Sequence, residues 1–286
     1  MANVAHPQAS RTACRYATPL AGGNTLPPGG AGSAVFLEWF VDAALPFIEL
    51  ETLMPDKHLS SQFDSELNAV STRVMELGGL VESQIRQAIY ALSHFNIEVA
   101  NQVTETEARV NAMEVDIDRE LSSIIARRQP TARDLRLLIA ISKTTANLER
   151  VGDEAEKIAR MVRSIINSGA PRSLPSLELR VAADLASGLL NKALNAFARL
   201  DTAAAVSILK EDDLIDKEFD GFVRKLITYM MEDPRMISPS LDLLFLAKAI
   251  ERIGDHAKNI AEFIIYVVKG EDVRHTSIEQ IESVVK

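Results

Sequence analysis

Two copies of one acidic motif occur in the chain, LERVGDEAEKIAR from Leu148 to Arg160 and IERIGDHAKNIAE from Ile250 to Glu262. Each copy places two carboxylates at positions i and i+4, with a glycine directly before the second carboxylate. Like charges at this spacing destabilise a helix by a few tenths of a kcal/mol, and a glycine in a helix interior costs up to about 1 kcal/mol relative to alanine. The repetition of both features therefore indicates a requirement other than helix stability.

Two more carboxylate pairs at the same spacing precede these copies, one in each half of the chain. We expect all four pairs to lie outside the core, at the same offset from the apolar stripe in both halves. If neighbouring helices adjoin, each half gathers four carboxylates. An all-oxygen site suits magnesium, manganese, calcium or iron and is open to zinc. The candidate metal ligands are Glu114, Asp118, Glu149, Asp153, Asp212, Asp216, Glu251 and Asp255. Solvated outer helix faces with ordinary ion pairs are the alternative.

Structural roles can also be predicted for several residues in or near these helices. Gly152 and Gly254 would suit a close approach by another helix or by a ligand, which would offset their cost in the helix. His256 follows Asp255 directly and so faces elsewhere, and we interpret it as a surface histidine. Met230-Met231 is interpreted as core filling.

The apolar residues recur with the period of an α-helix from about residue 60 onward. The expected helical segments are 60–93, 96–127, 132–168, 174–200, 202–232 and 239–269. Asn96 and Asp201 are expected as N-caps, and Pro130-Thr131 with Asp134 resembles a capping box. Together with the repeat, this pattern predicts an all-α fold of two tandem three-helix bundles. The expected domains are a disordered or non-native extension 1–53, bundles 54–170 and 171–272, and a C-terminal tail 273–286, with Met54 as the hypothetical functional start.

Composition excludes several classes of function. The 286 residues carry a formal net charge of −9, which argues against a nucleic-acid surface. The lone cysteine, Cys14, cannot build a disulfide framework, so a reducing cytoplasmic setting fits best. The apolar run 34–48 is interrupted by charges and is too short to span a bilayer, which needs roughly 20 apolar residues.

Common catalytic motifs are missing from the sequence. It contains no GxGxxG, no phosphate loop ending in GK[ST], no HExxH, no GxSxG and no ExxH of the di-iron type. We therefore expect no enzyme. A metal-dependent hydrolase or oxidase built on carboxylate-bound cations stays open as the alternative, as does a purely structural helical scaffold.

From about Lys57 to about His275 the chain closely resembles the PhoU family of bacterial phosphate-transport accessory proteins. The resemblance depends on the carboxylate pairs in both halves, the two Glu-Arg-hydrophobic-Gly-Asp stretches and three further segments. These segments are Met113–Asp118 (MEVDID), Arg128–Arg136 (RQPTARDLR) and Tyr229–Asp233 (YMMED). The extension 1–53 departs from the family, which usually begins near the position of Met54.

The resemblance implies two PhoU-type bundles in a cytoplasmic protein that forms a homodimer. It implies metal clusters of iron, zinc, manganese or magnesium, with Glu114, Asp118, Glu149 and Asp153 in the first and Asp212, Asp216, Glu251 and Asp255 in the second. It further implies a negative regulator of the phosphate-starvation (Pho) regulon and of phosphate uptake. The implied partners are the ATPase subunit of the phosphate ABC transporter and the phosphate-sensing histidine kinase of the membrane, with no nucleic acid and no transmembrane segment.

Overall fold

The computed structural model describes residues 61–168 and 177–286, and these ranges contain helices and no strand. The elements are α2 (Ser61–His94), α3 (Ile97–Arg128), α4 (Ala132–Asn167), α5 (Leu177–Arg199), α6 (Thr202–Glu232), η1 (Pro234–Met236), α7 (Ile237–Lys269) and α8 (Ile278–Val285). The six predicted helices are all present, with boundaries that differ by a few residues, whereas η1 and α8 were not predicted. The extension 1–53, Met54, Cys14 and the break before α5 lie outside the described residues.

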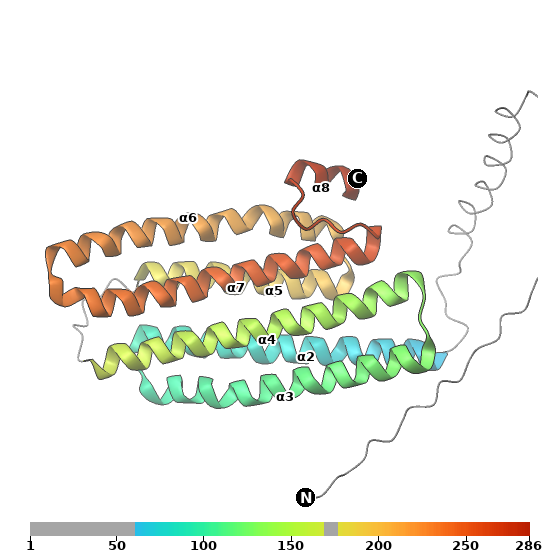
Figure 1. Cartoon of the computed structure of the whole chain (residues 1–286), viewed down its shortest axis with the longest axis horizontal. Coiled ribbons are helices and arrows are strands. Elements are labelled where there is room, and N and C mark those ends of the chain that lie inside the picture. The colour runs from blue at the N-terminus through green and yellow to red at the C-terminus, as the bar shows by residue number, and fades with distance from the viewer. Residues whose placement is uncertain (1–60, 169–176) are drawn as a thin grey trace, which may run out of the picture. The chain divides into compact units, whose positions relative to one another are not determined.

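The helices form two three-helix bundles, α2–α4 and α5–α7, which confirms the predicted fold (Figure 1). The apolar stripes of the helices pack into the core of each bundle, as their spacing predicts. In α4, Leu148, Val151 and Ala155 are fully buried, and Ile250, Ile253 and Ala257 occupy the matching positions of α7 at 0–1% exposure. A long helix with such a stripe gains most of its stability from packing this face against its neighbours.

The N-termini of the helices test the predicted capping residues. Asn96 accepts a hydrogen bond from the Val99 N–H at 3.0 Å, and Asp201 accepts one from the Ala204 N–H at 2.9 Å, which confirms both predicted N-caps. The predicted capping box at Thr131 is wrong, because within the described chain its side chain makes no capping hydrogen bond. The next residue, Ala132, has a φ of 46°, a left-handed backbone that departs from ordinary capping geometry.

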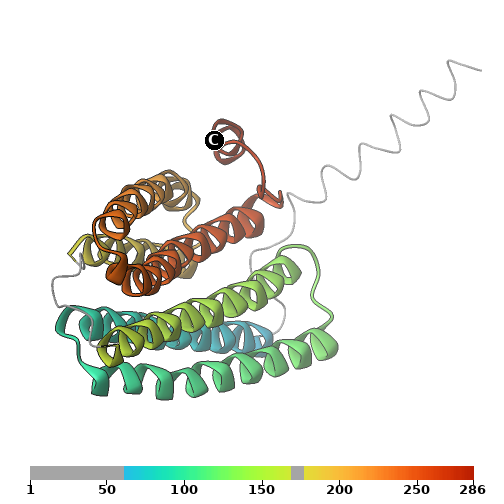
Figure 2. The ribbon, with the colours of Figure 1, turned by 60° about the vertical axis from the view of Figure 1, so that its left-hand side comes forward.

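The two bundles meet along α4 and α7, which lie side by side and antiparallel (Figures 1 and 2). Polar contacts occur at several points along this seam. Ser164 Oγ donates to Asp242 at 2.9 Å, and Arg252 donates to Glu154 at 3.2 Å. Toward the other end, Lys143 lies 5.4 Å from the ring centre of Phe263. The two copies of the motif thus lie opposite each other in the middle of this seam.

The C-terminal segment ends in α8, which packs on α6. Ser277 and Gln280 form a capping box at its start, and Ile281 is buried beneath it. Lys210 and Glu282 form an ion pair between α6 and α8. Across the described ranges, no helix is both long enough and apolar enough to cross a membrane.

Candidate cation sites and the groove between the bundles

The first acidic face consists of the predicted ligands on α3 and α4, namely Glu114, Asp118, Glu149 and Asp153. Burial raises the pKa of Glu114, and the nearby charges of Asp118 and Asp153 raise it further. Burial likewise raises the pKa of Glu149, followed by the charges of Asp153 and Glu114. Glu114, Glu149 and Asp153 therefore come together, as predicted. Asp118 lies at one side, where it accepts a hydrogen bond from Ser142 Oγ at 3.2 Å.

A fifth acidic residue, Glu107, lies beneath this face and was not predicted. It is 7% exposed and accepts a hydrogen bond from the Gln84 amide at 2.7 Å. Both side chains lie against Gly152, where an added Cβ would be 2.9 Å from Glu107 Oε2 and 3.2 Å from Gln84 Oε1. Burial raises the pKa of Glu107 to about 7, and the charges of Asp153 and Glu149 act in the same direction.

The second acidic face consists of Asp212 and Asp216 on α6 with Glu251 and Asp255 on α7. Burial and then the charge of Glu251 raise the pKa of Asp255 to about 6. Burial also raises the pKa of Asp216, followed by the charges of Asp212 and Glu251. The four predicted residues are therefore neighbours. The prediction that all of them lie outside the core is wrong for Asp212, which is 3% exposed.

Asp212 is buried because α6 and α7 approach each other closely at Gly254. An added Cβ at Gly254 would lie 3.2 Å from Asp212 Oδ1 and 2.7 Å from Ile215 Cδ1. The expectation that both motif glycines admit a neighbouring helix is thus confirmed. The buried carboxylate is neutralised by Lys258, whose Nζ lies 3.0 Å from Oδ2. Burying a carboxylate without such a partner would be strongly unfavourable.

The two halves also align differently from the prediction. The buried stripes Val103, Val110, Ile117, Leu121 of α3 and Ile208, Ile215, Phe222, Leu226 of α6 correspond at a constant difference of 105 in residue number. This register pairs Asp212 with Glu107, and Asp216 with Asn111. Glu114 and Asp118 lie two helical turns further along α3. Aligning the apolar stripes, rather than the acidic pairs, would have found Glu107 from the sequence.

The oxygen donors of both faces suit a hard cation. In the part of the chain that the structure describes, no three His, Cys, Asp or Glu side chains are already positioned to hold one metal ion. The first face does contain two buried acceptor atoms, Gln84 Oε1 and Glu107 Oε1, that lack a hydrogen-bond partner among the described residues. These oxygens, with the exposed carboxylate of Asp153 beside them, fit the chemistry of a cation but require side-chain rotation to enclose it.

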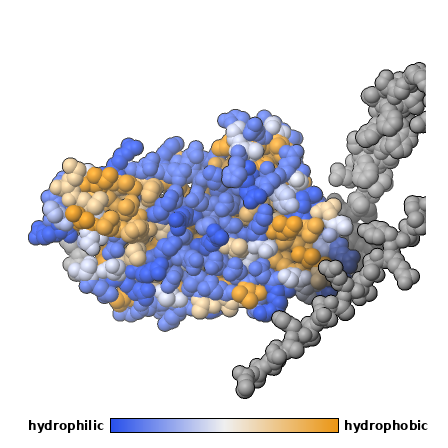
Figure 3. Space-filling model, in the orientation of Figure 1, coloured by the Kyte–Doolittle hydropathy of each residue, from blue (hydrophilic) through white to orange (hydrophobic). Residues whose placement is uncertain are grey.

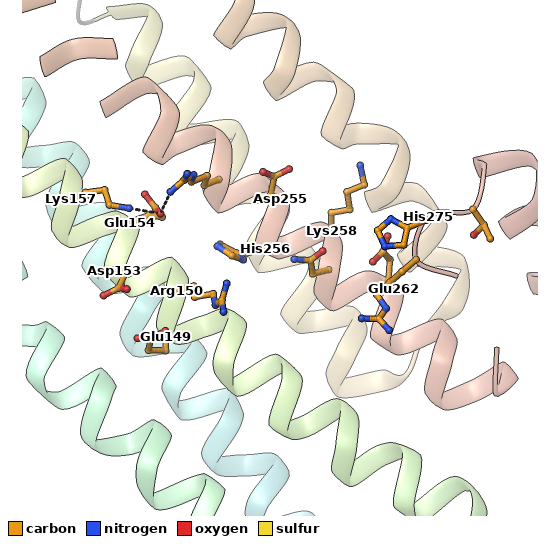
Figure 4. Close-up of a pocket in the computed structure, with 14 residues that line it drawn as sticks. Glu149, Arg150, Asp153, Glu154, Lys157, Asp255, His256, Lys258, Glu262 and His275 are labelled. Atoms are coloured by element: carbon orange, nitrogen blue, oxygen red, sulfur yellow. Dashed lines mark hydrogen bonds and ion pairs between the residues drawn. The ribbon is translucent and has the colours of Figure 1, made fainter. Parts of the chain in front are cut away.

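An open groove of about 1010 Å³ runs along the α4–α7 seam and is lined by both motif copies (Figure 4). Figure 4 shows Glu149 and Asp153 on the side of α4 that faces away from α7, whereas Arg150 extends toward His256. The groove lining carries five carboxylates, five lysine or arginine side chains and two histidines. The groove therefore has no strong preference for anions or cations as a whole.

His256 is not the surface histidine that we expected. It is partly buried between the bundles, and its Nδ1 lies 2.9 Å from Asn147 Oδ1. Burial lowers its pKa to about 4, although the nearby charge of Glu154 acts in the opposite direction. His256 is consequently a neutral part of the bundle interface at physiological pH. No pattern within α7 alone predicts that α4 packs against this face.

Two tandem three-helix bundles with an acidic face on each define a class of all-α proteins. The model of the PhoU domain matches residues 74–162 and 179–264, one match in each bundle. The chain belongs to the PhoU family.

Named relatives agree with the family model. The chain is 54% identical over 229 residues to a phosphate-specific transport system accessory protein PhoU homolog of Burkholderia sp., covering 80% of this chain and 97% of the relative. It is 46% identical over 233 residues to the phosphate-specific transport system accessory protein PhoU of Escherichia coli (strain K12), covering 82% and 96%.

Solved structures agree as well. The crystal structure of PhoU from Pseudomonas aeruginosa superposes with a TM-score of 0.71 at 44% identity, covering 73% of this chain and all of that chain. The phosphate transport system regulatory protein PhoU from Streptococcus pneumoniae gives a TM-score of 0.69 at 27% identity, covering 74% of this chain and 99% of that chain.

Proposed function

We propose that this chain is a cytoplasmic accessory protein of phosphate transport that represses the phosphate-starvation (Pho) regulon when phosphate is ample. The observation that carries the proposal is the match of both bundles to the PhoU domain, together with relatives named as phosphate-specific transport system accessory proteins. In this role the chain is an adaptor rather than an enzyme. It links the ATPase subunit of the phosphate ABC transporter to the phosphate-sensing histidine kinase.

An adaptor needs exposed surface that partners can recognise, and the α6–α7 hairpin offers such a surface at its tip. The tip patch consists of Ile227, Met231, Ile237, Leu241 and Phe245, which are 42–81% exposed. Figure 3 shows hydrophobic side chains gathered at this end of the hairpin. The expectation that Met231 fills the core is wrong, since it is 81% exposed. Exposed apolar patches of this kind often mark protein contacts.

The acidic faces supply the second part of the proposal, a bound metal cation that stabilises the docking-competent form. The candidate ions for the eight carboxylates are iron, zinc, manganese and magnesium. The proposed assembly of the chain is a homodimer. The support is chemical. Burial and mutual repulsion raise the pKa values of Glu114, Glu149, Asp216 and Asp255, and a cation would relieve that repulsion.

The test is a deletion of the gene in its source bacterium, with alkaline phosphatase measured in phosphate-rich medium. The proposal predicts high enzyme levels in the deletion strain and low levels after complementation with residues 54–286. A deletion strain that lacks any second copy and still represses the reporter normally would exclude the regulatory role.

A further inference from the structure

The groove between α4 and α7 brings corresponding residues of the two motif copies to opposite sides. Arg150 in the first copy corresponds to Arg252 in the second, and Glu154 corresponds to His256. All four side chains line the groove. Each copy thus contributes an arginine to the groove, but only the first contributes a carboxylate at the facing position.

Across the groove, Arg252 of α7 binds the carboxylate of α4. Its guanidinium donates to Glu154 Oε1 at 3.2 Å, and the ammonium group of Lys157 donates to the same oxygen at 2.7 Å. Glu154 is 5% exposed, so these two cations are its means of compensating for burial. One carboxylate thus balances two cations and leaves one positive charge in excess.

On the opposite side, Arg150 has no such carboxylate. Its side chain extends toward His256, and within residues 61–168 and 177–286 it makes no ion pair or hydrogen bond (Figure 4). The second copy has His256 in place of Glu154. It also has Asn259 in place of Lys157, so this side has lost one charge of each sign. Arg150 therefore keeps an unpaired positive charge beside the groove.

The hydrogen bonds of Asn147 determine which nitrogen of the neutral His256 ring carries the proton. Asn147 Nδ2 donates to the Lys143 carbonyl at 2.8 Å, and because a carbonyl can only accept, the orientation of this amide is determined. Asn147 Oδ1 accepts from Asn259 Nδ2 at 3.1 Å and lies 2.9 Å from His256 Nδ1. His256 Nδ1 is therefore the protonated nitrogen, and Nε2 keeps a lone pair that no described residue uses.

The charges around His256 sum to an excess of two positive charges. Arg150, Arg252 and Lys157 all lie near enough that their charges act on the ring, and the carboxylate of Glu154 acts in the opposite direction. A groove lined by one sign of charge concentrates ions of the other sign. The middle of the groove is therefore suited to a dianion, although its lining as a whole is balanced in charge.

The acidic face of the first bundle weakens this field without cancelling it. Glu149 and Asp153 lie on the side of α4 that faces away from α7, whereas Arg150 extends toward α7 (Figure 4). Exposed charges on different faces of a helix are screened by the solvent between them. We therefore expect a site of modest affinity.

We infer that the groove binds one inorganic hydrogen phosphate ion between Arg150 and His256. The forked guanidinium of Arg150 binds the charged oxygens, and the protonated oxygen of the ion donates to His256 Nε2. The ion then joins α4 to α7 and so links the two bundles. This inference goes beyond the accessory role proposed above, because it gives the chain a direct contact with phosphate.

The lone pair of Nε2 selects among anions of the same charge. Hydrogen phosphate offers both charged oxygens for Arg150 and an O–H group for His256. Sulfate has no proton to donate near neutral pH, and the phosphoryl group of a phosphate ester has lost its second proton at about pH 8. An oxygen of either group would face the lone pair of Nε2 as a second acceptor, which is unfavourable. The site should therefore prefer free phosphate to both.

The test is isothermal titration calorimetry of the full chain with inorganic phosphate at about pH 8. The chain is first freed of metal, because a cation on an acidic face could bind phosphate by itself. We expect one phosphate per chain, with sulfate and methyl phosphate binding at least tenfold more weakly. Arg150→Gln should weaken phosphate binding at least tenfold. Arg160→Gln, at an exposed position of α4, makes the same change in net charge and should change binding less than twofold.

A further variant supplies the carboxylate that the second copy lacks. His256→Glu should pair with Arg150 as Glu154 pairs with Arg252, and a carboxylate in this place should abolish phosphate binding. Urea unfolding of each variant establishes that it is folded before the titration.

The inference is overturned if the metal-free chain binds no phosphate, if sulfate or methyl phosphate binds as tightly as phosphate, or if the two arginine variants have equal effects. Undiminished binding by folded His256→Glu would overturn it as well. The titration needs only the purified chain, so its failure would leave the accessory role standing. Failure of the reporter test would remove that role and leave the measured phosphate site unaffected.

Discussion

The close approach between α6 and α7 at Gly254 predicts that alanine at this position destabilises the protein. An added Cβ would lie 2.7 Å from Ile215 Cδ1, which is too short for a real contact, and 3.2 Å from Asp212 Oδ1. Ile215 is 2% exposed, so its side chain has little room to move. The Asp212 carboxylate is tied to Lys258 at 3.0 Å, so it is restrained as well.

The size of the effect follows from two opposing contributions. Alanine gains up to about 1 kcal/mol over glycine in a helix interior. Overpacking a buried contact costs about 1–3 kcal/mol, because side chains must leave their preferred rotamers. We therefore expect Gly254→Ala to lower the free energy of unfolding by about 1 kcal/mol. Gly221→Ala, in the interior of α6, is the matched control, because its Cβ would meet no described atom within 4 Å.

Urea unfolding followed by circular dichroism measures both variants under one condition. The control should gain about 0.5–1 kcal/mol, so the two variants should differ by about 2 kcal/mol in the free energy of unfolding. A difference in m-value would point to a change in the unfolded state instead. If Gly254→Ala stabilises the protein as much as Gly221→Ala does, the packing argument for the motif glycines is wrong.

Three further predictions follow from individual contacts. Burial raises the pKa of Glu107 from 4.5 to about 7, so the folded state retains a proton that the unfolded state loses, and wild-type stability falls as pH rises through this window. Glu107→Gln does not titrate, so its stability should rise relative to that of the wild type by up to about 3 kcal/mol between pH 4.5 and pH 8. Urea unfolding at each pH measures this difference. Asn96→Ala should cost about 1 kcal/mol through loss of the cap, whereas Thr131→Ala should cost almost nothing by the same assay. Met231→Ser with Phe245→Ser should leave the unfolding midpoint nearly unchanged but abolish reporter repression.

Each of these predictions has a control or a contradicting result. Glu105→Gln, exposed on the same helix as Glu107, should show the pH profile of the wild type. Equal losses from Asn96→Ala and Thr131→Ala would contradict the observed difference in capping. Full repression by the double serine variant would remove the tip patch from the docking surface. Serine at Val181, an exposed apolar residue on α5, tests whether any loss is specific to the tip.

The sequence predicted the helices well because its strongest signals are local. Periodic apolar residues and the side chains of Asn96 and Asp201 act within a single helix, and each performs the expected role. Gly152 and Gly254 were also understood correctly, since a repeated cost in helix stability implied close packing. Local sequence signals were therefore sufficient to predict the fold class and most of the helix boundaries.

The site was predicted less completely because it depends on the register between helices. The i, i+4 spacing of Glu114 and Asp118 matched that of Asp212 and Asp216, yet the buried stripes align Asp212 with Glu107 instead. A two-turn slip leaves every spacing within a helix unchanged, so motif spacing alone cannot detect it. Burial of Asp212 likewise depends on Lys258 as its partner in the folded structure.

The bundle interface was missed for a related reason. His256 and Glu154 are polar, so their positions on α7 and α4 resemble exposed faces when each helix is considered alone. Their burial follows from the pairing of the two motif copies, in which Asn147 contacts His256 and Arg252 donates to Glu154 Oε1. Polar contacts of this kind give no hydrophobic signal in the sequence, and their partners become evident only in the assembled fold.

The most direct test of the adaptor role is a binding measurement with purified components. The full chain, loaded with Mn²⁺, is mixed with the ATPase subunit of the phosphate ABC transporter and with the cytoplasmic part of the phosphate-sensing kinase, and complexes are separated by size-exclusion chromatography. We predict that a single complex contains all three proteins and that the Met231→Ser, Phe245→Ser variant fails to form it. Separate elution of the chain from both partners, under conditions in which it is folded and loaded with metal, would contradict the account.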